Sequence, residues 1–136
     1  MHSNHLKVHL SPDDPNLTST LHYSEYFDPL CVWQLWESSR FLIELITSSE
    51  IEISKEKNET ILDFSCGIGI LGVVCAAKGC KRVVLTDLED ANLERIVEMN
   101  FKENQRLFPK GFENWEYVPA DWLEIISASD PKLSES

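Results

Sequence analysis

The strongest constraint on the fold is a glycine-rich segment, G-x-G-x-x-G at 67–72, which separates an apolar run from a helical pattern. The run at 60–64 has the length and composition of a buried parallel strand. Beyond the glycines, apolar residues recur at helical spacing from position 70 until Gly79, which we expect to end the helix. A strand, a glycine turn and a helix in this order are typical of nucleotide-binding α/β folds.

The same alternation continues toward the C-terminus. A second apolar run lies at 82–86, a helical stripe at 87–104 and a third strand candidate at 115–118. Alternating strands and helices predict a parallel sheet with right-handed crossovers. Doubly wound sheets usually continue beyond three strands, so we expect an incomplete fold or one completed by a partner.

The remaining pattern predicts the domain boundaries. A helix is expected over 32–48, with Trp36 in the core, and the partial Rossmann-like domain is expected over 32–126. Residues 1–31 are expected to form a polar segment, in which alternation at 6–10 allows a short strand. His2, His5 and His9 in this segment are interpreted as part of a frayed terminus and not as a metal site. The tail at 127–136 is expected to be loose.

Charge and composition exclude several functions. The 136 residues carry 23 acidic and 12 basic side chains, a net charge of −11, which disfavours nucleic acids and anionic membranes as partners. No apolar run reaches the ~20 residues of a membrane span, and the N-terminus has no secretory pattern. The four cysteines form no C-x-x-C pair. We therefore expect a reduced protein of the cytoplasm or, alternatively, the nucleus; the oligomeric state is not indicated.

The glycines and one acid suggest an adenosine-bearing cofactor. Gly67 and Gly69 allow the main chain to turn tightly and approach a ligand, whereas Gly72 allows close packing of helix on strand. Asp87 ends the second strand, 20 positions after Gly67. A carboxylate there can accept hydrogen bonds from both hydroxyls of a ribose.

Asp63 distinguishes between two adenosine-bearing cofactors, a nicotinamide dinucleotide and one with a methionine moiety. This carboxylate precedes Gly67 by four residues and would repel the pyrophosphate of a nicotinamide dinucleotide. It suits the ammonium of a methionine moiety, as in S-adenosylmethionine (SAM), which has no phosphate. A fragment of an NAD-dependent oxidoreductase remains an alternative.

The segment 61–72 resembles the first motif of the class I, seven-β-strand methyltransferases. Within them it is most similar to the methyltransferase-like family that modifies lysine, and in one branch histidine, on proteins. Three further strings support this resemblance: V-W at 32–33, T-D at 86–87 followed by Asn100 and Asn104, and D-W at 121–122. The match runs from about Val32 to Trp122.

The resemblance implies a SAM-binding α/β domain whose substrate is a protein. It implies that Trp33 borders the cofactor, that Ser65, Cys66 and Gly67 follow its methionine part, that Asp87 binds the ribose, and that Asp121 and Trp122 flank the adenine. The family generally has glycine where Ser65 stands, and serine suits that bend only at negative φ.

The acceptor side of the reaction is not assigned. In the family it follows the fourth strand, as an acidic residue and a tyrosine a few positions on, and this sequence contains no such element. We therefore name no catalytic residue and no metal ligand, and whether this chain is itself an enzyme stays open. A truncated, non-catalytic isoform that serves as a binding module is an alternative.

Overall fold

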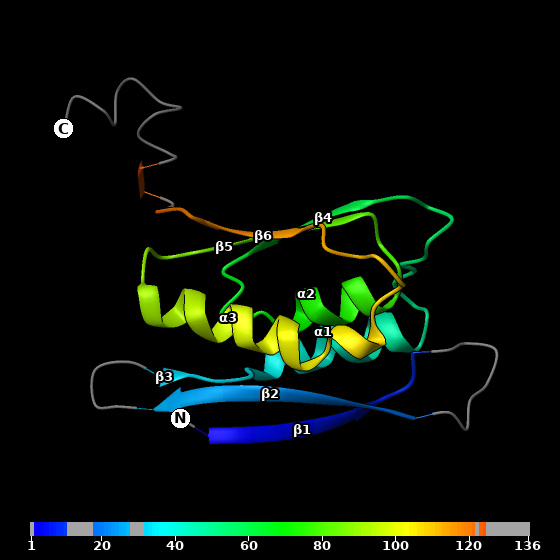
Figure 1. Cartoon of the computed structure of the whole chain (residues 1–136), viewed down its shortest axis with the longest axis horizontal. Coiled ribbons are helices and arrows are strands. Elements are labelled where there is room, and N and C mark those ends of the chain that lie inside the picture. The colour runs from blue at the N-terminus through cyan, green and yellow to red at the C-terminus, as the bar shows by residue number, and fades with distance from the viewer. Residues whose placement is uncertain (1, 11–17, 28–31, 122, 125–136) are drawn as a thin grey trace.

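The computed structural model describes residues 2–10, 18–27, 32–121 and 123–124, which form three layers (Figure 1). A parallel sheet forms one outer layer, helices form the middle layer and an antiparallel sheet forms the other outer layer. The parallel sheet consists of β4 (Thr60–Phe64), β5 (Arg82–Asp87) and β6 (Trp115–Pro119), in that order. Both pairs are parallel, which confirms the predicted α/β fold class.

Three helices lie between the sheets: α1 (Glu37–Thr47), α2 (Ile70–Ala77) and α3 (Ala91–Glu103), followed by the 3₁₀ turn η1 (Gln105–Leu107). The helix predicted at 87–104 starts later because the carboxylate of Asp90 accepts hydrogen bonds from the N–H groups of Asn92 and Leu93.

The prediction for the first helix was wrong at its N-terminus. Val32–Trp33 form the short strand β3, and α1 begins only at Glu37. The side chain of Trp36, predicted to lie in the core, is 53% exposed. The apolar spacing that suggested one helix is therefore shared between a strand and a helix.

The core lies between the parallel sheet and the helices. Many of its fully or almost fully buried members come from β5, α2 and α3, among them Val83, Leu85, Val73, Val74, Ile96, Val97 and Phe101. Gly72 allows this packing, since a β-carbon there would lie 2.9 Å from Leu85 Cδ2 and 3.0 Å from Val83 Cγ1. On the opposite face of the sheet Leu62, Phe64 and Val118 are exposed, so β4 is not buried on both faces as predicted.

The N-terminal residues form an ordered antiparallel sheet, in the order β1 (His2–Val8), β2 (Ser19–Phe27) and β3. The prediction of a frayed terminus at the histidines was therefore wrong, because all seven residues of β1 pair with β2. Leu21 and Tyr23 of β2 are buried against the helical layer. The predicted tail at 127–136 lies outside the described residues, and the predicted domain division stays a prediction.

Neither a membrane span nor a metal cluster is present in the described part of the chain. None of its helices is long and apolar enough to cross a bilayer. Nor do these residues bring together three His, Cys, Asp or Glu side chains in a way that could hold a metal ion.

Candidate functional site

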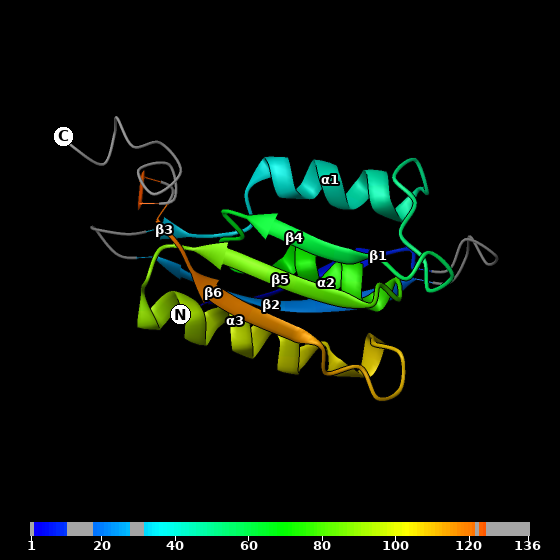
Figure 2. The same cartoon turned by 90° about the horizontal axis from the view of Figure 1, so that it is seen from above.

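The carboxyl ends of β4, β5 and β6 point to the same edge of the sheet, where the predicted site residues gather (Figure 2). Asp87, the last residue of β5, connects two segments there. Its Oδ2 accepts a hydrogen bond of 2.9 Å from the N–H of Gly67, and its Oδ1 accepts one of 2.8 Å from the N–H of Leu88. The structure thus brings the predicted ribose ligand against the glycine turn.

The turn after β4 is tight and hydrogen-bonded. The N–H of Cys66 donates to the carbonyl of Thr86 at 2.9 Å, and the N–H of Gly69 donates to the carbonyl of Cys66 at 3.0 Å. Gly67 has φ +54°, and a β-carbon built on it would meet no atom within 4 Å. The main chain at Gly67 is therefore open to a ligand.

Ser65 occupies a backbone conformation that favours glycine. Its φ is 57°, in the left-handed region, although serine was expected to suit this bend only at negative φ. Strain of this kind is often stored at functional sites, where the surrounding contacts impose it. The next two residues, Cys66 and Gly67, donate hydrogen bonds from their main-chain N–H groups to the end of β5, and these bonds hold the turn in place.

Asp63 carries a buried oxygen without a partner. Its Oδ2 has no hydrogen-bond partner among the residues that the structure describes. Burial, together with the negative charge of Asp87, raises the pKa of Asp63 to about 6. An unpaired buried acid is costly, and a cationic group placed beside it would lower that cost.

Cys66 is a neutral thiol within the turn. Burial, reinforced by the charges of Asp63 and Asp87, raises its pKa far above the usual thiol range. The Sγ–H donates to the carbonyl of Gly67 at 3.5 Å. A thiol that stays protonated is a poor nucleophile, so Cys66 fits a contact role along a ligand better than a role in covalent chemistry.

The predicted adenine side is partly described. Asp121 follows β6, and its Oδ1 accepts a 2.8 Å hydrogen bond from the N–H of Leu123. The N–H of Ala120 donates to the main-chain carbonyl of Asp87 at 2.9 Å, which joins the ends of β6 and β5. An open cavity of about 340 Å³ lies there, lined by Leu88, Glu89, Pro119, Ala120, Asp121 and Glu124. Trp122 lies outside the described residues, so its predicted role is untested.

Trp33 lies in the other sheet, and its predicted contact with a cofactor stays a prediction. Its ring packs on that of Tyr26, with centroids 5.5 Å apart. The two views place β3 at the end of the molecule toward which β4, β5 and β6 point (Figures 1 and 2).

Two side chains that support the site were not singled out for that role. Asn100 of α3 is fully buried and donates from Nδ2 to the carbonyl of Ile68 at 2.9 Å. This hydrogen bond supports the glycine turn from the side of the helical layer. Tyr117 of β6 donates from its hydroxyl to the carbonyl of Leu88, next to Asp87. In the sequence, Asn100 could have been recognised as an amide at a core position of the apolar stripe at 87–104.

A sequence model of the family described as lysine methyltransferases matches residues 16–129. The chain belongs to this family. It is also 28% identical over 78 residues to the protein N-terminal and lysine N-methyltransferase EFM7 of Gibberella zeae, a match that covers 57% of this chain and 28% of the relative. The predicted methyltransferase resemblance is therefore confirmed, and the family disfavours the oxidoreductase alternative.

Solved structures agree on the fold. One described as a candidate SAM-dependent methyltransferase from Streptococcus mutans superimposes with a TM-score of 0.58 at 17% identity, over 80% of this chain and 26% of that protein. A second, a candidate methyltransferase solved in complex with SAH, superimposes with the same score at 16% identity and the same coverage. The chain thus spans just over a quarter of the relatives it matches. Membership of this family supports SAM as the cofactor.

Proposed function

We propose that this chain is the SAM-binding part of a protein-lysine methyltransferase. The observation that carries the proposal is the meeting of Asp63, the turn at 65–69 and Asp87 at one edge of the parallel sheet. The family assignment supports the reaction class, because the matching sequence model is described by lysine methylation.

The residues at this edge fit the proposed cofactor. The unpartnered Oδ2 of Asp63 suits an ammonium, reached directly or through a water molecule. Asp87, at the end of β5, has two carboxylate oxygens with acceptor capacity left for ribose hydroxyls. The cavity beside Asp121 would take the base.

The reaction needs little acid–base chemistry from this part of the protein. SAM held by these residues would supply an electrophilic methyl group, which would pass from the sulfonium sulfur to the neutral Nζ of a lysine that has released its proton to solvent. The described residues would bind and orient the donor and exclude water from it. None of them is assigned as a catalytic residue, and the residues that orient the acceptor stay unassigned.

Calorimetry on the purified chain tests the cofactor, with NADH as the comparison ligand and circular dichroism as the check on folding. SAM should bind, NADH should not, and Asp87→Asn should weaken SAM binding by about ten-fold, since one acceptor oxygen is lost. The matched control is Glu98→Gln, an exposed acid of α3, which should bind like the parent. A folded chain that does not bind SAM would contradict the proposal.

The acceptor is tested on the complete protein, with isotope-labelled SAM and a cell extract. Mass spectrometry of the products distinguishes methylation of lysine Nζ from methylation of histidine or of an N-terminal amine, which the name of the fungal relative includes. We expect methyllysine, and labelling confined to either other group would overturn the lysine assignment. The cytoplasm, with the nucleus as alternative, stays a prediction.

A further inference from the structure

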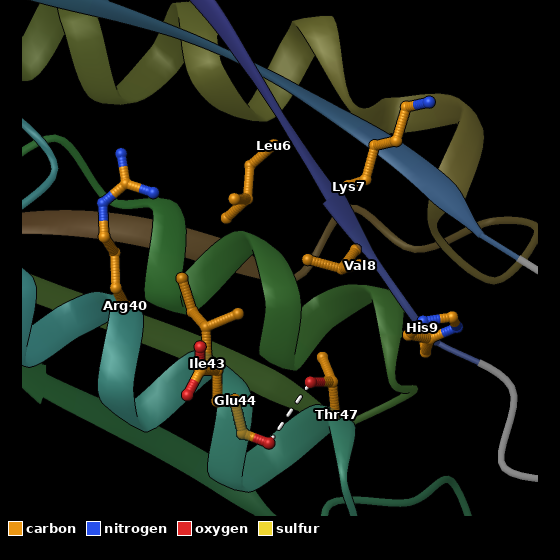
Figure 3. Close-up of a pocket in the computed structure, with 8 residues that line it drawn as sticks. All are labelled: Leu6, Lys7, Val8, His9, Arg40, Ile43, Glu44 and Thr47. Carbon is orange, nitrogen blue, oxygen red and sulfur yellow. Dashed lines mark hydrogen bonds between the residues drawn. The ribbon is translucent and has the colours of Figure 1, made fainter. Parts of the chain in front are cut away.

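The antiparallel sheet has an open edge. Among the described residues the strand order is β1-β2-β3, so β1 pairs with β2 on one side only. The open side of β1 faces α1, and an open cavity of about 280 Å³ lies between them. It is lined by residues of the strand and of one helix face: Leu6, Lys7, Val8, His9, Arg40, Ile43, Glu44 and Thr47 (Figure 3).

The hydrogen bonds of β2 show which main-chain groups of β1 point to the open side. The N–H groups of His22 and Ser24 donate to Asn104 and Asn100 of α3, away from β1. In an antiparallel pair, residues opposite such positions also turn away from the partner strand. His5 lies opposite His22 and Ser3 opposite Ser24. Ser3, His5 and, by the same alternation, Lys7 therefore direct N–H and C=O to the open edge.

The side chains next to this edge differ between the two faces of the sheet. Leu6 and Val8 point toward Ile43 of α1, whereas Lys7 points to the other side of β1 (Figure 3). Val8 and Ile43 are 5% and 2% exposed and form a closed apolar floor, so the apolar surface left to a ligand at this edge is mainly that of the half-buried Leu6. A strand added here would place alternate side chains on that floor and the others beside His5 and Lys7.

The charges of the residues around the edge favour a partner segment of opposite charge. The chain has a net charge of −11, but residues 1–10 contain one lysine, three of the four histidines and no acid, and α1 adds Arg40 and Glu44 to the lining of the cavity. An acidic segment would complement this basic strand, and the general acidity of the protein would repel it elsewhere. A second copy of β1 would instead bring two basic strands together, which cross-strand pairing disfavours.

We propose that the open edge of β1 binds an extended segment of a partner protein in which acidic and apolar residues alternate. The main chain of the segment continues the sheet by strand addition. Its apolar side chains pack on Leu6 and fill the cavity beside Val8 and Ile43, and its acidic side chains face His5 and Lys7. This surface is separate from the proposed cofactor site, and its occupation does not depend on SAM.

Binding is measured by fluorescence anisotropy with a labelled, end-capped peptide in which Glu and Val alternate over seven residues. The comparison peptides are an alternating Lys–Val sequence and a block sequence with the same Glu and Val content. The alternating acidic peptide should bind at least about ten-fold more tightly than either. Equal binding of all three peptides would overturn the proposal.

Two substitutions test the edge itself. Lys7→Glu reverses its charge, and the matched control Lys110→Glu makes the same change on a distant exposed lysine. His5→Pro removes an outward N–H without touching the bonds between β1 and β2. Both β1 variants should lose at least about ten-fold in affinity, while the control keeps it. If Lys7→Glu binds as the parent does, the proposal fails even where His5→Pro does not fold.

Amide hydrogen exchange tests independently whether the peptide forms hydrogen bonds with the open edge of β1. The amides of Ser3, His5 and Lys7 should exchange fast in the free protein and slowly with the acidic peptide bound, whereas those of Asn4 and Leu6 are already protected by β2. Slow exchange at the first three without peptide, together with a dimer in sedimentation, would mean that a second copy occupies the edge and would overturn the proposal.

Discussion

The two sheets of this protein are held to the helices in different ways. In the parallel sheet, apolar side chains such as Val83 and Leu85 are completely buried against α2 and α3. In the antiparallel sheet, Leu21 and Tyr23 are also buried, but β2 is held by side-chain amides in addition: Asn104 accepts from the N–H of His22, donates to its carbonyl, and thereby replaces a neighbouring strand. Asn100 does the same at Ser24. The comparison indicates that buried amide side chains can fix the position of a strand as specifically as the packing of apolar side chains does.

Asn100 is the residue on which both halves depend, so it gives the largest expected effect. Asn100→Ala would leave the N–H and carbonyl of Ser24 and the carbonyl of Ile68 buried without this partner. We expect the free energy of unfolding to fall by about 3 kcal/mol, as measured by urea denaturation.

The same change separates the two halves when SAM binding is measured alongside stability. Since Asn100 supports the glycine turn, the folded variant should bind SAM more weakly than the parent. Asn92→Ala, at an exposed position of the same helix, should change stability by less than about 0.5 kcal/mol. A loss below 1 kcal/mol for Asn100→Ala would refute the view that these amides hold β2.

The contrast also explains what the sequence could predict. The parallel strands and α2 follow from local apolar patterns beside the glycines, and Asp63 and Asp87 follow from their positions at strand ends. The pairing of β1 with β2 does not, because the amides that fix β2 lie 76 and 82 residues further along the chain. The conformation of Ser65 and the lack of a partner for Asp63 were equally hidden, since both depend on how neighbouring segments meet.

The packing half of the comparison is tested at Gly72. In an exposed helix, alanine in place of glycine stabilises by about 1 kcal/mol. Here the added β-carbon would meet Leu85 and Val83 at 2.9 and 3.0 Å, so we expect Gly72→Ala to lower the free energy of unfolding by about 2 kcal/mol. A thermal melt that shows higher stability instead would mean that α2 and β5 are not closely packed.

In its ionised form, Asp63 lowers stability but favours binding of the proposed cofactor. Its pKa is raised from 3.8 to about 6 in the folded protein, so the folded state favours the protonated carboxyl. The stabilising contribution is complete below pH 3.8 and is lost as pH rises through about 6. Asp63→Asn should therefore raise the free energy of unfolding at pH 8 by about 1.5 kcal/mol.

SAM binding should show the opposite dependence on pH, because an ammonium is bound by the ionised form of Asp63. Its affinity should rise through about pH 6 in the parent protein and stay level in Asp63→Asn. Calorimetry from pH 5 to pH 8 makes this measurement. The same rise in both proteins would show that another group is responsible.

Ser65 gives the smallest effect, and it tests whether the cofactor turn is strained. A residue other than glycine in the left-handed region costs roughly 1–2 kcal/mol, so Ser65→Gly should raise the free energy of unfolding by about 1 kcal/mol despite the greater freedom that glycine gives the unfolded chain. Ser54→Gly, at a serine outside that region, should lower stability slightly through the unfolded state alone. If both substitutions destabilise equally, the positive φ of Ser65 carries no strain.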